Sequence, residues 1–213
     1  MSTRQQSFAQ GEFYHLYNRG TEKRKIFLDK QDHQRFLWLM YICNTNRSIE
    51  LRDTGAHFDR KEPLVSVGAY CLMPNHFHIL ITENTEGGIS KYMLKLMTAY
   101  TMYFNKKYER SGKLCEGTFK SQYVNSDRYM KYLYSYIHMN PAKLKDKNWK
   151  TNTRKNPKEL LEFVYTYPYS SMTEYKERSF NILDPLPFPV YFKNINEHKK
   201  ELFGWLKLLK LDN

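Results

Sequence analysis

The 213-residue sequence contains few cysteines and no long apolar run. Its three cysteines, Cys43, Cys71 and Cys115, form no CxxC pair, and an odd number argues against a disulfide framework. No segment approaches the roughly 18 consecutive apolar residues of a membrane-spanning helix. The first ten residues are polar and lack the apolar core of a signal peptide. These absences predict a protein of the reducing cytoplasm with no membrane partner.

Acidic residues are scarce relative to basic ones. The chain has 34 Lys and Arg against 22 Asp and Glu, which gives a formal net charge of +12. This balance favours a polyanionic partner, nucleic acid first. Aromatic residues make up 16%, with 18 tyrosines. Aromatic side chains beside basic ones suit single-stranded nucleic acid, whose exposed bases can stack, although we expect most of the tyrosines to complete a core and its rim.

Short apolar runs bounded by turn residues alternate with longer helical patterns in the first two thirds of the chain. Strands are predicted at about 13–18, 64–72, 76–81 and 117–124. Helices are predicted to begin after the capping residue Asp29, at Ile89 and at Arg128. The order strand, helix, strand, strand, helix, strand, helix is typical of α+β folds. We therefore predict an antiparallel sheet with helices on one face and the other face free for functional groups.

The texture of the sequence changes after residue 146. We predict one domain over residues 11–146 and an irregular, partly helical C-terminal extension over 147–213. Within the extension, residues 147–160 are polar, and 197–209 have the apolar spacing of a short amphipathic helix. Residues 44–62 are polar and irregular, so they are predicted to form a loop or an insertion.

Two histidines lie in the third predicted strand, with one bulky apolar residue between them. Successive strand residues alternate between faces, so His76 and His78 point one way and Phe77 the other. Imidazoles about 6–7 Å apart along a strand can converge on one cation. The pair alone does not establish a metal site, because a third ligand is needed. His15, on the first strand, is predicted to be a packed strand residue rather than a ligand.

The last predicted helix of the first domain carries a polar stripe beside its apolar one. The stripe consists of Tyr129, Tyr132, Tyr136 and Asn140. Tyr136 and Asn140 are four residues apart and therefore lie on one side of the helix. Pro141 ends the helix and should push Asn140 out of helical geometry, where its amide oxygen could turn towards a metal. The same amide could instead cap the helix end.

Polar and basic residues near the predicted turns and helix ends are candidates for contacts with DNA. They are Asn18, Arg19, Lys23, Arg24, Lys95, Lys106, Lys120 and Arg128. Lysine and arginine neutralise phosphates, which makes binding strongly dependent on salt. The alternative for each is an ordinary solvated surface charge.

Several segments, taken together, resemble a known enzyme family. They read Tyr-His-Leu-Tyr-Asn-Arg-Gly at 14–20, Ala-Tyr-Cys-Leu-Met-Pro-Asn-His-Phe-His at 69–78, Tyr-Phe-Asn-Lys-Lys-Tyr at 103–108 and Tyr-Ile-His-Met-Asn-Pro at 136–141, with a weaker match, Tyr-Pro-Tyr-Ser-Ser, at 167–171. In this order they span about residues 11–175. The combination resembles the REP-associated tyrosine transposases and related single-tyrosine insertion-sequence transposases of the HUH superfamily.

The resemblance implies a domain with an RRM-like, ferredoxin-like antiparallel sheet. It also implies that His76 and His78 are the metal-binding pair, Tyr136 the nucleophile and Asn140 a further metal ligand. It implies a divalent cation, Mg²⁺ or Mn²⁺, and a single-stranded or hairpin DNA partner, with the protein acting as a monomer or homodimer. The implied activity is nicking and rejoining of single-stranded DNA through a 5′-phosphotyrosine intermediate. One departure is visible at 115–118, where this chain has Cys-Glu-Gly-Thr and relatives often carry a Trp-Gln-Gly-Arg type of sequence.

Two other readings stay open at this point. The first is a catalytically silent protein of the same fold that only recognises DNA hairpins, a reading that the departure at 115–118 motivates. The second is an RNA-hairpin binding protein, whose sheet should carry stacking aromatics where this chain has its histidine pair. A two-motif phosphoesterase fits less well, because the sequence has no second His-x-Thr/Ser strand.

Overall fold

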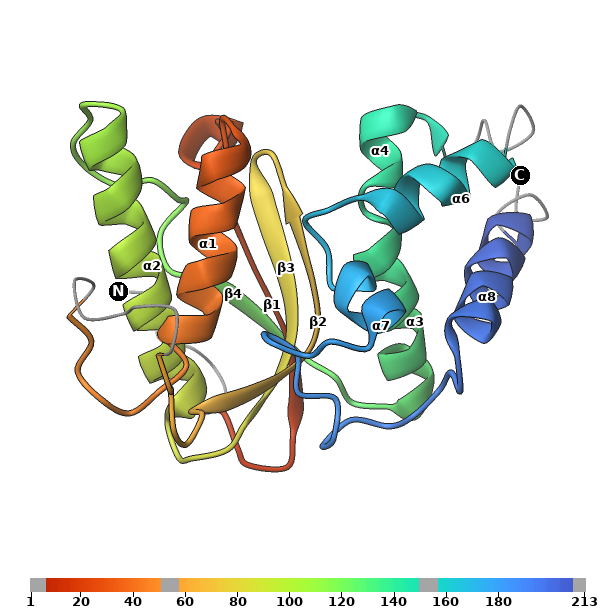
Figure 1. The fold of residues 1–213 in the computed structure, drawn as a ribbon, viewed down its shortest axis with the longest axis horizontal. Helices are drawn as coiled ribbons and strands as arrows, with labels where there is room; N and C mark the ends of the chain where they lie inside the picture. The colour runs from red at the N-terminus through yellow and green to blue at the C-terminus, as the bar shows by residue number, and fades with distance from the viewer. Residues whose placement is uncertain (1–6, 51–57, 150–156, 209–213) are drawn as a thin grey trace.

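A four-stranded antiparallel sheet lies at the centre of the protein (Figure 1). The computed structural model describes residues 7–50, 58–149 and 157–208, with side chains as far as residue 204. The strands are β1 (Phe13–Arg19), β2 (Val65–Met73), β3 (His76–Glu83) and β4 (Lys120–Tyr123), in the spatial order β2-β3-β1-β4. The four predicted strands are thus confirmed. β4 is shorter than expected, because Gly117 adopts a turn conformation with a φ of 79°.

The register of the strands sorts their side chains onto two faces. His78 of β3 lies opposite Tyr17 of β1 and opposite Cys71 of β2. Directly paired residues of antiparallel strands share a face, so His78 and Tyr17 project together, and Phe77 projects to the other side. The tight turn between β2 and β3 supports this arrangement: the carbonyl of Pro74 accepts hydrogen bonds from the amides of Ile26 and Phe27, at 2.8 and 3.1 Å.

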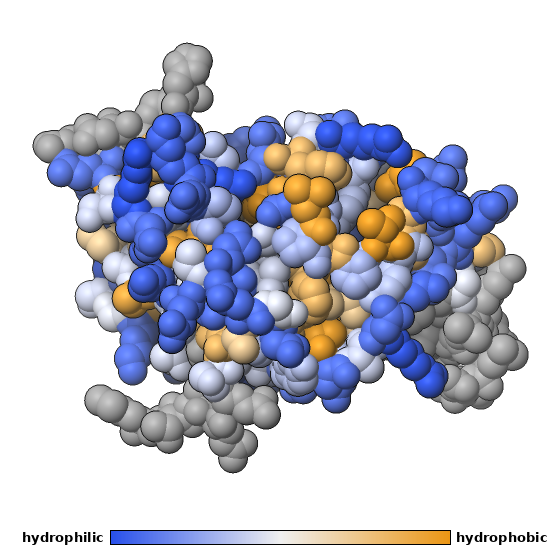
Figure 2. All heavy atoms as spheres, turned by 90° about the horizontal axis from the view of Figure 1, so that it is seen from below, coloured by the Kyte–Doolittle hydropathy of each residue, from blue (hydrophilic) through white to orange (hydrophobic). Residues whose placement is uncertain are grey.

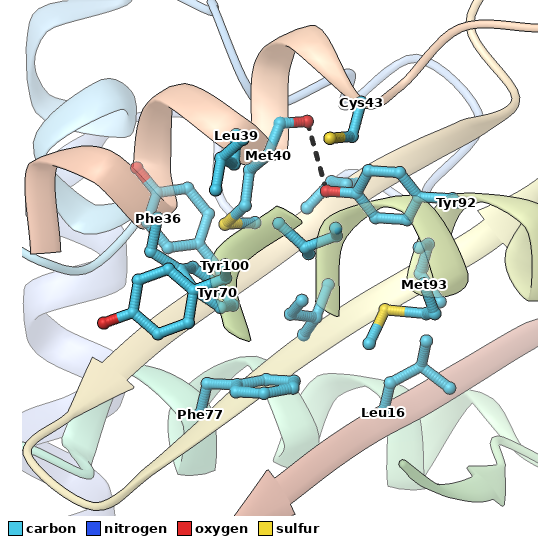
Figure 3. Packing of buried hydrophobic residues seen from close by; sticks show 14 of the residues in the cluster. Leu16, Phe36, Leu39, Met40, Cys43, Tyr70, Phe77, Tyr92, Met93 and Tyr100 are labelled. Atoms are coloured by element: carbon cyan, nitrogen blue, oxygen red, sulfur yellow. Dashed lines mark hydrogen bonds between the residues drawn. The ribbon is translucent and has the colours of Figure 1, made fainter. Parts of the chain in front are cut away.

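Helices α1 (Lys30–Ile42) and α2 (Gly88–Lys107) cover one face of the sheet and enclose the main core. Asp29 caps α1 as predicted, and forms a capping box with Asp32. Leu16, Phe36 and Phe77 are fully buried between sheet and helices (Figure 3). The buried hydroxyl of Tyr92 is satisfied within this core, because it donates to the carbonyl of Met40 at 3.2 Å.

Helix α3 (Asp127–Met139) packs on the opposite face (Figure 1), which corrects the expectation of helices on one face only. Ser126 caps it by accepting a hydrogen bond from the amide of Tyr129. The apolar stripe of the helix needs a buried partner, and the sheet offers small side chains for it. Leu133 and Ile137 pack with Ala69 and Cys71 in a second cluster. The sheet face of the histidines is therefore partly covered.

The remaining helices lie on the same side as α3. They are the short α4 (Ala142–Lys145) and, in the C-terminal extension, α6 (Pro157–Thr166), α7 (Met172–Glu177) and α8 (Ile195–Leu208); a 3₁₀ turn, η1 (Thr21–Lys23), follows β1. The predicted helix at 197–209 is confirmed as far as residue 208, and residue 209 lies outside the described residues. α6 was not predicted, because its first turn is polar and its apolar spacing starts only at Leu160.

The C-terminal extension is attached to the edge of the sheet through β2. The amide of Leu72 donates to the carbonyl of Tyr169 at 2.9 Å, and the hydroxyl of Tyr167 donates to the carbonyl of Leu72 at 2.7 Å. These bonds satisfy an edge strand that would otherwise stay open. In the predicted loop at 44–62, the described residues 44–50 and 58–62 contain no helix or strand, and 51–57 lie outside the description. Among the described helices, none has the length and apolarity to cross a membrane.

Candidate functional site

The histidine face of the sheet meets α3 at a cluster of aromatic rings. Tyr136 projects from α3 so that its ring centroid lies 5.4 Å from that of His78 and 6.0 Å from that of His15. The rings of His76 and His78 are 5.1 Å apart. The tertiary structure thus brings together the predicted histidine pair and the predicted tyrosine, which are about 60 residues apart in the sequence.

Both predicted metal-binding histidines are held in place through Nδ1. The Nδ1 of His76 lies 2.7 Å from the amide oxygen of Asn75, and the Nδ1 of His78 lies 2.9 Å from Nε2 of His15. A cation would therefore be bound through Nε2 of each ring. Burial, with a smaller contribution from the charge of Lys143, lowers the pKa of His76 to about 4. Burial is also the main cause that lowers the pKa of His78 well below its usual value, and Lys143 acts in the same direction. Neutral imidazoles are the form that binds metal.

His15 is a packed strand residue, as predicted, but its contact with His78 makes it part of the site. It is buried, with 7% of its surface exposed, and burial lowers its pKa to about 4. Its hydrogen bond to Nδ1 of His78 fixes the orientation of that ring, which is the usual role of a group behind a metal-binding histidine. The sequence alone does not predict this contact, because it depends on the register of β1 against β3.

Asn140 lies at the end of α3, where it is close to both His76 and Tyr136. Its Nδ2 donates to the carbonyl of Tyr136 at 2.9 Å. Its side chain opposes the effect of burial on two groups, raising the pKa of His76 and lowering the pKa of Tyr136. Contrary to expectation, Asn140 keeps helical angles (φ −53°, ψ −41°) before Pro141, because the chain continues almost directly into α4.

The donor atoms of this site fit a divalent cation. The Oδ1 of Asn140 is buried and, within the described part of the chain, has no partner in hydrogen-bonding geometry. A buried polar atom without a partner calls for an explanation, and a bound ion is one. An amide oxygen with two neutral imidazoles suits Mn²⁺ better than Mg²⁺, which prefers oxygen ligands alone. Consistent with this mixed set, the described residues contain no cluster of three or more His, Cys, Asp or Glu suited to a metal.

Tyr136 is protonated in the resting site. Its side chain is half-buried, and desolvation raises its pKa above the usual value of 10.0, an effect that Asn140 partly offsets and Tyr17 reinforces. A phenol in this state is a weak nucleophile, so reaction at Tyr136 requires an additional positive charge nearby.

A hollow of about 490 Å³ extends from the histidines along α3. Its lining includes His15, Tyr17, His78, Gln122, Tyr129, Tyr132, Leu133 and Tyr136. The rings of Tyr129, Tyr132 and Tyr136 follow one another at 6.2 and 6.0 Å, with interplanar angles of 19° and 20°. The predicted polar stripe of α3 thus forms a row of nearly parallel rings. Sequence reasoning missed Tyr17 and Gln122, which join the hollow only through strand pairing.

Some of the basic candidates for DNA contact lie around the histidine face. Arg19 is exposed at the end of β1 opposite His76, and Lys120 is exposed on β4 opposite Tyr17. Arg128 is exposed in the first turn of α3. Lys143, which the sequence analysis did not select, is also exposed and acts electrostatically on both histidines. It was missed because Pro141 was taken as the end of the helical region.

Other candidates do not reach the site. Asn18 is buried and projects to the opposite face; its amide donates to the carbonyl of Gly117 at 3.3 Å and accepts from the amide of Arg19 at 2.8 Å. Lys95 donates to two backbone carbonyls, those of Thr45 and Arg47, on the α2 side. Both residues serve the fold at these positions, because their polar groups are used inside the protein.

Three candidates are placed outside the cluster of rings. Lys106 is exposed on α2, which covers the opposite face of the sheet. Lys23 is exposed in η1, and Arg24 follows it with its guanidinium 3.3 Å from Glu22. η1 adjoins the β2–β3 turn, since the amide of Gly20 donates to the carbonyl of Asn75. Lys23 and Arg24 therefore lie near the edge of the histidine face, whereas Lys106 does not.

The segment that departs from the expected family pattern supports the end of β1. Cys115 is buried and pairs with Gly20, and the amide of Glu116 donates to the carbonyl of Arg19 at 2.9 Å. The segment therefore positions the backbone beside Arg19, whatever its own side chains contact.

Comparisons with known proteins agree with this fold. A search among curated proteins gives no match. One solved structure that the chain resembles is a REP-associated tyrosine transposase bound to a REP hairpin, with a TM-score of 0.51 and 14% sequence identity, covering 91% of this chain and 96% of that one. At this identity the likeness shows the fold alone. The sequence model of the IS200-like transposases matches residues 13–140, from the start of β1 to Asn140. This match includes both histidines, Tyr136 and all four described strands, and the chain therefore belongs to the IS200-like transposase family.

Proposed function

We propose that this protein nicks and rejoins single-stranded DNA beside a hairpin, through a covalent 5′-phosphotyrosine at Tyr136. The observation that carries the proposal is the position of the Tyr136 ring, 5.4 Å from the ring of His78, above a face with two neutral histidines and an unpaired Asn140 oxygen. Family membership and the likeness to a hairpin-bound transposase support a hairpin-bearing DNA substrate.

His76, His78 and Asn140 would hold a divalent cation, Mn²⁺ or Mg²⁺. When bound there, such an ion neutralises a non-bridging phosphate oxygen and stabilises a phenolate. The histidines contribute neutral imidazoles at pH 7, because burial keeps the pKa of each below its usual value. The protein's own part is to aim these ligands: Asn75 fixes the ring of His76, and His15 fixes the ring of His78.

Tyr136 performs the covalent step. Its phenolic oxygen attacks the phosphorus, the bond from phosphorus to the 3′ oxygen breaks, and that oxygen takes a proton to give a free 3′-OH. The phenol proton passes to water, since His15, with its pKa lowered to about 4, is a poor base. The new phosphodiester preserves the bond energy, so a second 3′-OH can attack it and rejoin DNA without ATP.

The row of tyrosines and the nearby cations would hold the substrate. Tyr129 and Tyr132 offer ring faces to unpaired bases that approach Tyr136 along α3. Arg19 and Lys120 lie on the histidine face, and Arg128 is exposed at the start of α3; all three would contact phosphates. Whether one chain or two form the working enzyme is a separate part of the proposal, open to measurement of the mass of the protein–DNA complex in solution.

The test is a covalent-adduct assay on labelled hairpin-bearing single strands, with Mn²⁺ or Mg²⁺ and with EDTA. We expect the wild-type protein to form a metal-dependent adduct stable in denaturing gels. Tyr136→Phe should form none, whereas Tyr132→Phe, the neighbouring ring on the same stripe, should retain the reaction. An adduct of equal yield with Tyr136→Phe would remove Tyr136 from the proposed role.

A second candidate function is binding of DNA or RNA hairpins without cleavage. The observation that favours it is the raised pKa of Tyr136, caused first by desolvation, which leaves the phenol inactive unless positive charge is supplied. Tight, metal-independent binding with no adduct on any strand of a hairpin library would support this alternative. A preference for strands with a 2′-OH would assign the binding to RNA.

A further inference from the structure

A second pocket lies behind α3, on the side of the helix away from the histidines. Its volume is about 280 Å³, close to the lower end of the range of about 300–1,000 Å³ typical of small-molecule sites. Its walls are mainly aromatic, formed by Tyr134, Tyr175, Phe180, Phe188, Tyr191 and Phe192. Tyr134 belongs to α3 and Tyr175 to α7, and the other four come from the extended segment that leads to α8. Flat walls of this kind suit a planar ring.

Two buried histidines provide the polar groups of this pocket. His138 and His198 both line it, with ring centroids 5.0 Å apart and exposed fractions of 0% and 4%. Nε2 of His138 lies 2.8 Å from Oγ of Ser171. Nδ1 of His138 and Nε2 of His198 are buried and have no hydrogen-bond partner among the described residues. A native structure rarely leaves two such atoms unpaired in one place unless a ligand or water completes them.

The pocket favours an anion. The charged side chains among its described lining residues are Arg178 and Lys193, both exposed, and this set includes no carboxylate. Apolar side chains also reach the surface here, with Val190 83% and Phe180 43% exposed. Figure 2, which views the molecule from below, shows apolar residues at the surface among polar ones on the face along which the segment before α8 runs in Figure 1.

We propose that this pocket binds an unpaired nucleotide of a DNA strand. The base would lie between the aromatic walls, with its polar edge towards His138 and His198 and its phosphate towards Arg178 and Lys193. A nucleotide combines a planar ring, a polar edge and a negative charge, the three properties that this lining selects, and membership of a transposase family makes DNA the relevant source. The site is separate from the histidine face and plays no part in the proposed nicking reaction.

The test measures binding of the four deoxynucleoside monophosphates to the full chain by saturation-transfer NMR and calorimetry, in EDTA. Two companion probes separate the parts of the ligand: the corresponding nucleosides, which lack the phosphate, and deoxyribose 5-phosphate, which lacks the base. We expect saturable binding of at least one monophosphate, weaker binding of its nucleoside by about tenfold, and no binding of the sugar phosphate.

Two variants remove the positive charges without disturbing the fold. Arg178 has a φ of 52°, a left-handed conformation that asparagine tolerates, so Arg178→Asn is preferred to alanine. Lys193→Gln keeps most of the side-chain length. Each should weaken the monophosphate about three- to tenfold and leave the nucleoside unchanged. Lys176→Gln is the matched control, because Lys176 is exposed on α7 but does not line the pocket, and its affinity should equal that of the wild type.

Three results would overturn the proposal. Absence of saturable binding by every monophosphate would leave water as the occupant of the pocket. Equal affinity in Arg178→Asn, Lys193→Gln and wild type would place the bound nucleotide elsewhere, including the hollow beside Tyr136. Equal binding of deoxyribose 5-phosphate would show a plain anion site with no role for the aromatic walls. Because the measurements use neither metal nor strand cleavage, they stand or fall independently of the proposed nicking activity.

Discussion

Helix α3 carries the same motif twice, a tyrosine followed four residues later by a polar side chain, and the two copies have opposite surroundings. Tyr136 and Asn140 face the sheet histidines, where the tyrosine is half-buried and lines an open hollow. Tyr134 and His138 face α7 and α8, where the tyrosine is 5% exposed and burial raises its pKa well above the usual value. The residue types are alike, so the difference lies in what each copy contacts.

The comparison teaches how a helix can serve structure and chemistry at once. In the buried pair, Tyr134 and His138, the ring of His138 is held by a hydrogen bond with Ser171 and packs against the ring of Tyr134. In the pair that faces the sheet histidines, the Oδ1 of Asn140 has no hydrogen-bond partner among the described residues, and Tyr136 lies near solvent. A group that is fully enclosed by other side chains contributes mainly to stability, whereas a group that is held in place but still borders solvent can react with a substrate. The following predictions test this division.

Replacing His78, on the sheet face near Tyr136, should have the largest effect on adduct formation. We expect His78→Ala to reduce metal-dependent adduct formation by about 1,000-fold, because a direct ligand is lost together with the group that His15 orients. The free energy of unfolding in EDTA should fall by about 1–3 kcal/mol, because His78 is buried and its removal leaves a cavity and takes away the partner of His15 Nε2. Adduct yield at limiting Mn²⁺ and urea unfolding measure the two effects; undiminished adduct would contradict the assignment.

Removing His138 should lower stability but spare adduct formation. We expect His138→Ala to lower the free energy of unfolding by about 2–4 kcal/mol, because it leaves a cavity in a fully buried place and removes the hydrogen bond between His138 and Ser171. Adduct formation per folded molecule should stay within about twofold of wild type. Urea denaturation gives the first quantity and active-site titration the second. A large loss of adduct formation in His138→Ala without a loss of stability would contradict the structural role given to His138.

The inner face should also set an acid limit on stability. Burial lowers the pKa of His138 well below its usual value and that of His198 to about 4. Around them lie Ser171, Tyr134, Tyr165, Tyr175 and the rim residues Arg178 and Lys193.

In the unfolded chain both rings take up protons near pH 6.5, but in the folded protein they do so only at lower pH. The contribution of the two neutral rings to the free energy of unfolding is therefore complete above about pH 6.5, and it is lost as the pH falls from there towards 4. The urea concentration at the midpoint of unfolding should decrease over this pH range, and the decrease should be smaller in His198→Gln than in the wild type. Identical slopes for the two proteins would show that His198 is not the titrating group.

The smallest effect is expected from the outermost ring of the outer face. Tyr132 is 41% exposed and its ring lies 6.0 Å from that of Tyr136. Tyr132→Ala should weaken binding of a hairpin with a single-stranded extension by about five- to tenfold and leave a blunt hairpin unaffected, because only unpaired bases can stack on it. Tyr132→Phe, which keeps the ring, is the control. Equal losses for both DNAs would assign Tyr132 a general rather than a stacking role.

Much of the fold was accessible from local sequence patterns. The side-chain alternation at β3, the cap Asp29 and the helical pattern from Ile89 predicted their elements, because these signals depend on neighbours within one turn or one strand. The placement of α3 was not predicted. Its amphipathic pattern shows that one stripe must be buried, but not against which face of the sheet.

The candidate site divides in the same way. The sequence by itself identified His76, His78, Tyr136 and Asn140 as a group, through strand alternation, helical spacing and family resemblance; their chemical roles remain predictions. Only the tertiary structure placed His15 behind His78, put Lys143 beside the histidines and formed a pocket on the far side of α3. The physical reason is that side-chain direction is fixed within a few residues, whereas strand register and helix docking depend on contacts between segments far apart in the chain.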